Sequence, residues 1–140
     1  ELIEPPIARL AAERATATDN ARMRAHLRAA QQSADAASFD HHCEMVRRSI
    51  VRATHNSILL RLHDALGPIQ WLSPVGSNGD DAPKPEDIAA VCRRLCEIAE
   101  AVARGDANAA EAAVRTSIDH AERIAAARTD AAEAASPTAA

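Results

Sequence analysis

The clearest pattern in the chain is a pair of apolar seams at helical spacing on either side of a Gly-Asp dipeptide. Residues 86–104 and 110–124 each place apolar side chains three and four positions apart, which predicts one buried face on each of two helices. Gly105 suits the left-handed position that ends a helix, and Asp106 suits the N-cap of the next one. A link this short predicts that the two helices pack antiparallel.

The same spacing predicts four earlier helices. The first runs to about Thr16, the second follows Thr18 as its N-cap, the third covers 36–54, and the fourth follows Asn56 and ends near Gly67 or Trp71. No strand pattern is visible, so the expected fold is all-α, an antiparallel bundle of about six helices.

Breaker residues divide the chain without splitting the core. Residues 73–85 collect Gly, Pro, Asn and Ser and are expected to form a loop. Neither the four helices before this loop nor the two after it would close a core alone, so we expect one domain over residues 1–128. The alanine-rich tail, residues 129–140, is expected to be frayed or disordered.

Composition narrows the function classes. The 140 residues carry a net charge of −4 and only 1% aromatics, so direct nucleic-acid binding by this segment is not expected. No apolar run approaches the roughly 20 residues that span a bilayer. Three cysteines cannot all pair with one another, which favours reduced thiols and a cytoplasmic location. The chain opens at Glu1 inside a helical pattern, and we expect it to be a piece of a longer protein.

Three segments in order give the chain a family resemblance. They are Glu4-Pro-Pro-Ile-Ala-Arg-Leu-Ala-Ala-Glu-Arg-Ala15, Ile50-Val-Arg-Ala-Thr-His-Asn-Ser-Ile-Leu-Leu60 and Ile98-Ala-Glu-Ala-Val-Ala-Arg-Gly-Asp-Ala-Asn-Ala-Ala110. Over about residues 1–125 the chain resembles the FCD domain, the C-terminal effector-binding domain of FadR-type GntR-family transcriptional regulators. The resemblance implies a bundle around a central ligand cavity, a homodimer, and a small carboxylate or related effector. It also implies a preceding winged helix-turn-helix domain that binds operator DNA.

The resemblance also implies where a metal would sit. Many members of the family hold a divalent ion with one Asp and three His, and the matching positions here are Cys43, Arg47, Leu95 and Ser117. Only Cys43 keeps a metal-ligand type, so we expect that the usual metal site is absent and that no cofactor is bound.

Arg47 is the first candidate for replacing that metal. Its guanidinium would lie beside the apolar stripe of the third helix and could anchor a carboxylate or phosphate. Ser117 would add a hydroxyl, and Cys43, Leu95 and His63 would complete the lining of the cavity. The competing interpretation is that Arg47 reaches solvent or pairs with a nearby carboxylate such as Glu44 or Asp40.

Other interpretations remain open. Cys43, Cys92 and Cys96 could converge as a thiol site for a soft metal, or each could fill core space as a small apolar side chain. No phosphate loop, nucleophile elbow or paired His/carboxylate motif indicates an enzyme. The domain could also serve only for dimerisation. The alternative from another class is a stand-alone helical scaffold protein with no small-molecule ligand.

Overall fold

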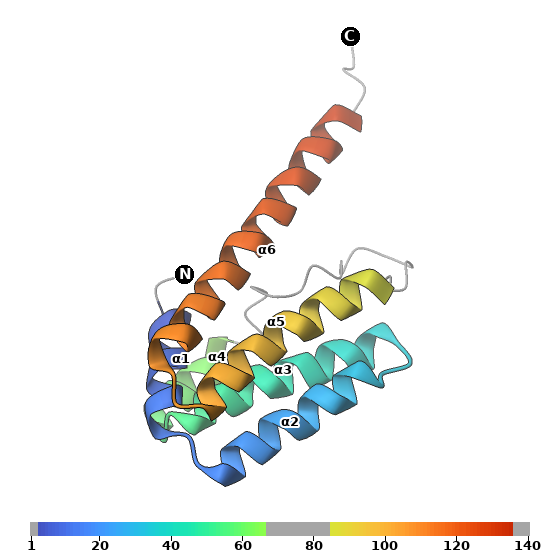
Figure 1. Cartoon of the computed structure of the whole chain (residues 1–140). Coiled ribbons are helices and arrows are strands. Elements are labelled where there is room, and N and C mark those ends of the chain that lie inside the picture. The colour runs from blue at the N-terminus through green and yellow to red at the C-terminus, as the bar shows by residue number, and fades with distance from the viewer. Residues whose placement is uncertain (1–2, 67–84, 136–140) are drawn as a thin grey trace.

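The computed structural model describes residues 3–66 and 85–135, except for the side chains of residues 128, 132 and 135 (Figure 1). This part of the chain forms α-helices and no strands, which confirms the all-α prediction. The helices are α1 (Glu4–Arg14), α2 (Ala17–Gln31), α3 (Ala36–Ala53), α4 (Ser57–Leu66), α5 (Pro85–Ala103) and α6 (Ala107–Ala135).

The helices form a bundle in which α2, α3 and α5 lie alongside one another (Figure 1). α1 packs against α6, α3 and α5, and so joins the two halves of the chain. α6 diverges from α5 after their junction, and its C-terminal part extends beyond the other helices (Figure 1). None of the helices in the described ranges is long and apolar enough to cross a membrane.

The junction of α5 and α6 forms as its sequence predicts. Gly105 has φ 70°, and the N–H groups of Gly105 and Asp106 donate to the carbonyl oxygens of Val102 and Ala101. This pair of bonds is a Schellman motif, which needs the left-handed backbone that glycine adopts without strain. Asp106 caps α6, since its Oδ1 accepts from the N–H of Ala109 at 3.0 Å.

The start of α2 differs from the prediction. Thr16, rather than Thr18, is the N-cap, and its Oγ1 accepts from the N–H of Asp19. Asp19 reciprocates by accepting from the N–H of Thr16 at 3.0 Å, which completes a capping box. The physical reason for the difference is that Asp19, at the third helical position, serves both hydrogen bonds for Thr16.

The helix α6 is longer than the sequence predicts, because its C-terminal part is rich in alanine. The chain is helical to Ala135, whereas the sequence placed a frayed or disordered tail from Thr129. Alanine has the highest helix propensity, and residues 107–135 contain neither Gly nor Pro. Trp71 and the predicted loop up to residue 84 lie outside the described residues, and so do residues 136–140.

The core is built from the predicted seams. Among the described residues, the largest fully buried side chains are those of Phe39, Met23, Leu95 and Ile98. Leu95 and Ser117, which the resemblance placed at a central cavity, are 0% and 2% exposed.

Candidate ligand pocket

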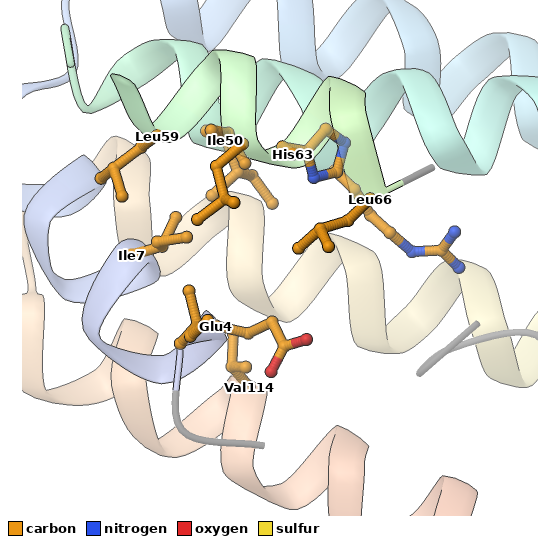
Figure 2. Close-up of a pocket in the computed structure, with 11 residues that line it drawn as sticks. Glu4, Ile7, Ile50, Leu59, His63, Leu66 and Val114 are labelled. Atoms are coloured by element: carbon orange, nitrogen blue, oxygen red, sulfur yellow. The ribbon is translucent and has the colours of Figure 1, made fainter. Parts of the chain in front are cut away.

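A small pocket lies to one side of the bundle, between α1, α3, α4 and α6 (Figure 2). We call it the α4 pocket, because α4 supplies four of its lining residues. Its volume is about 40 Å³, enough for a few water molecules. Its lining consists of Ile3, Glu4, Ile7, Arg47, Ile50, Val51, Leu59, Leu62, His63, Leu66 and Val114.

Helical spacing explains the apolar wall. Ile50 lies three residues after Arg47 on α3, and Leu59, Leu62 and Leu66 recur at intervals of three and four on α4. Positions three and four apart share one face of a helix, so both helices turn apolar side chains towards the same space. Figure 2 shows Ile7 of α1 and Val114 of α6 on the opposite side of that space.

Arg47 and His63 are joined through Glu44 at the polar side of the pocket. Arg47 donates to Oε2 of Glu44 at 3.1 Å, and Nε2 of His63 lies 2.8 Å from Oε1 of the same carboxylate. The side chains of Arg47 and His63 are only 6% and 9% exposed, so the link is shielded from solvent. The carboxylate of Glu44 thus holds two pocket-lining groups in fixed positions.

The neighbours of Glu44 lower the pKa of its carboxyl group. Burial alone would raise the pKa of Glu44, but the hydrogen bond from His63 and the charge of Arg47 outweigh it. The pKa of Glu44 therefore lies below its usual value, and the group remains an anion at neutral pH. Arg47 is buried at the pocket wall, which the first sequence interpretation expects. It also pairs with Glu44, which the competing interpretation expects.

A second carboxylate enters the same pocket from α1. Glu4 is 9% exposed and lines the pocket opposite α4 (Figure 2). The pocket therefore carries acidic and basic groups within a mostly apolar wall. A ligand there would gain most of its binding free energy by burying apolar surface. Only a small part of the ligand would contact a charged side chain.

The other predicted site residues lie outside this lining. Cys43, Leu95 and Ser117 are buried on α3, α5 and α6, but none of them contributes to the wall of the α4 pocket. Ser117 donates its hydroxyl to the carbonyl oxygen of Ala113 at 3.0 Å, within its own helix. The structure thus brings Arg47 and His63 to one pocket and leaves the other three in the packed interior.

The thiols are poor ligands or nucleophiles as they stand. Burial raises the pKa of Cys43 to about 12 and also raises the pKa values of Cys92 and Cys96. Cys96 donates to Oε1 of Glu100 at 3.4 Å. The thiolate is the form that binds metals and attacks electrophiles, so these environments favour the space-filling interpretation.

The positions that the resemblance assigns to a metal do not fit one. Cys43, Arg47, Leu95 and Ser117 offer one protonated thiol, a cation, an alkyl group and a hydroxyl. Within the described ranges, no three His, Cys, Asp or Glu residues are arranged to hold a metal ion.

Two carboxylates of the pocket region were not predicted as site residues. Glu44 was predicted only as a possible partner of Arg47, and Glu4 was not predicted to belong to the site. The spacing of three residues between Glu44 and Arg47 gave a signal, since such pairs share a helix face. No local signal joins Glu44 to His63, because 19 residues and a helix junction separate them.

Comparison with known proteins adds one finding. The family model described as FCD domain matches residues 1–120. No curated protein matches the chain.

Proposed function

Because the chain belongs to the FCD domain family, we propose that it is the ligand-sensing and dimerisation domain of a GntR-family, FadR-type transcriptional regulator. In this proposal the domain forms a homodimer, works in the cytoplasm and controls a winged helix-turn-helix domain that binds operator DNA. It is a regulatory domain and not an enzyme.

The α4 pocket is the proposed effector site, and its lining is the observation that carries the proposal. The effector is a small molecule with an apolar body and an anionic group. Eight of the eleven lining residues are apolar, and they favour the apolar body. Arg47 and His63 provide donors for the anionic group. Here Arg47 takes the anchoring role that a metal has in many relatives, so no metal or other cofactor is required.

The proposed mechanism is a shift between two arrangements of the regulator. An effector that prefers one arrangement of the bundle changes the spacing of the two DNA-binding domains in the dimer. A ligand shifts such an equilibrium only through different affinities for the two states. The coupling between the sites is then typically about 1–3 kcal/mol.

Native mass spectrometry of the purified domain tests this proposal. We expect a dimer that carries a small organic adduct. Ile7→Phe should remove the adduct, since Ile7 lines the pocket and the larger ring would fill it. Ile124→Phe is the matched control, because Ile124 lies on α6 and takes no part in the lining.

The other outcomes have distinct meanings. An adduct that survives Ile7→Phe would place the ligand elsewhere in the molecule. A bare dimer whose thermal unfolding temperature is unmoved by a panel of small carboxylates would leave only the dimerisation role. A bare monomer would favour the scaffold alternative. Loss of the adduct in Arg47→Met as well would support the anchoring role of Arg47.

A further inference from the structure

α4 is attached to the molecule differently from the other helices. None of its residues is buried, and among the described helices only α3 has a backbone that lies close to that of α4. Ile58, Leu62 and Leu66 are 75%, 40% and 56% exposed, although they are large and apolar. A helix with so little buried surface gains little free energy from docking, and such elements open at low cost.

The N-terminal end of α4 is fixed. Oδ1 of Asn56 caps the helix by accepting from the N–H groups of Ile58 and Leu59, at 3.0 and 3.3 Å. The preceding residue, His55, has φ 52° and places its Nε2 2.9 Å from Oδ2 of the buried Asp19. This end of the helix is therefore tied to the start of α2.

Two polar contacts join the rest of α4 to α3. Arg48 donates twice to Asp64, at 2.8 Å each, but the pair is exposed. Exposed ion pairs contribute little and are screened by salt. The better shielded contact is the one between His63 and Glu44, which lies at the pocket wall.

The α4 pocket is too small for an organic ligand in this arrangement. About 40 Å³ accepts a few water molecules, whereas small-molecule sites usually have several hundred. Of the four walls, α1, α3 and α6 all contribute residues to the buried core, and α4 contributes none. The wall that can move at least cost is therefore α4.

We propose that α4 is a movable wall that turns about its fixed N-terminal end and enlarges the α4 pocket, with the Glu44–His63 contact as its latch. Opening separates His63 from Glu44, moves Leu62 and Leu66 away from α1, and leaves Arg47 on α3. That the enlarged pocket admits the effector rests on the proposed function, whereas the motion itself does not.

Amide hydrogen exchange of the free domain tests the motion. We expect amides at residues 61–66 to exchange on the order of tenfold faster than those at residues 47–53 of α3. Glu44→Gln should speed exchange at residues 61–66 by a further factor on the order of tenfold, because it removes the charge from the latch. Exchange in α5 and α6 should not change.

Glu111→Gln provides the matched control. Glu111 also accepts from two side chains, Arg9 and Arg115, but lies on α6 away from α4. Equal protection of α4 and α3 in the unaltered protein would overturn the proposal. So would a Glu44→Gln effect spread evenly over all helices, or one that Glu111→Gln reproduces in α4. These measurements need no ligand, so their failure is distinct from the absence of an adduct in native mass spectrometry.

Discussion

A single carboxylate can connect residues that are distant in the sequence when its oxygens accept several hydrogen bonds. Asp19 is the clearest case, because its Oδ2 accepts from the backbone and hydroxyl of Thr16 and lies against His55, while its Oδ1 accepts from Arg22. The residue is 4% exposed. It therefore caps α2 and holds the α3–α4 corner at the same time.

Acid should weaken the fold through this carboxylate. Burial would raise the pKa of Asp19, but the hydrogen bonds from Thr16 and the contact with His55 lower it below the ordinary value of 3.8. A lowered pKa contributes stability that is present above pH 3.8 and is lost as pH falls through the folded-state pKa. Asp19→Asn should therefore destabilise the protein at pH 6 and reduce the fall in stability between pH 5 and 3.

Urea unfolding midpoints at pH 6, 4.5 and 3 provide the measurement. Asp130→Asn is the control, because Asp130 is exposed on α6. If the midpoints of Asp19→Asn fell with pH as steeply as those of the unaltered protein, the acid sensitivity would have another source.

Among elements, the α5–α6 junction depends most on one backbone conformation. Gly105→Ala should cost about 1–2 kcal/mol, because an L side chain is strained at φ 70°. Sterics add little, since a Cβ at this position would lie 3.6 Å from the carbonyl oxygen of Ala12. Gly105→Asn should cost less, because Asn adopts left-handed backbone more readily.

Chemical denaturation of both variants measures this difference. Equal losses of stability in Gly105→Ala and Gly105→Asn would mean that side-chain contacts, and not the left-handed backbone, determine the free-energy cost at this junction.

The helix ends could be predicted where the residues that determine them are close together in the sequence. The Gly105-Asp106 junction and the Asn56 cap follow from residues within one helical turn, and the structure confirms both. The start of α2 was missed because Thr16 and Thr18 are both good caps, and the choice depends on the side chain of Asp19. The helical run to Ala135 differs from the prediction because the helix propensity of alanine outweighs fraying at this end of the chain.

The candidate site was less predictable because it depends on packing between helices. Arg47 was named from the resemblance together with its helix face, His63 was named from its helix face, and both line the α4 pocket. Leu95, Ser117 and Cys43 were assigned to a central cavity by resemblance alone. In this chain those positions are buried in the packed interior. Only the arrangement of helices reveals that Arg47 and His63 share a pocket at α4.

For the whole molecule, stability should depend on this filled interior much more than on the pocket wall. Leu95 is 0% exposed, so Leu95→Ala should destabilise the domain by about 2–5 kcal/mol. Leu62 is 40% exposed, so Leu62→Ala should cost less than about 1.5 kcal/mol.

Thermal and urea unfolding of the two variants give the comparison. A mild effect of Leu95→Ala would indicate that the interior around it is loosely packed, with room for a ligand after all.

The position of Glu44 has a consequence for how the domain folds. An interior guanidinium is less costly to bury when an anion lies beside it. Here the neutralising group sits three residues earlier on the same helix, so both charges leave the ribosome together and meet as soon as α3 coils. Folding need not wait for a metabolite or an ion to arrive. Under the proposed function, the domain would therefore be folded before its effector binds.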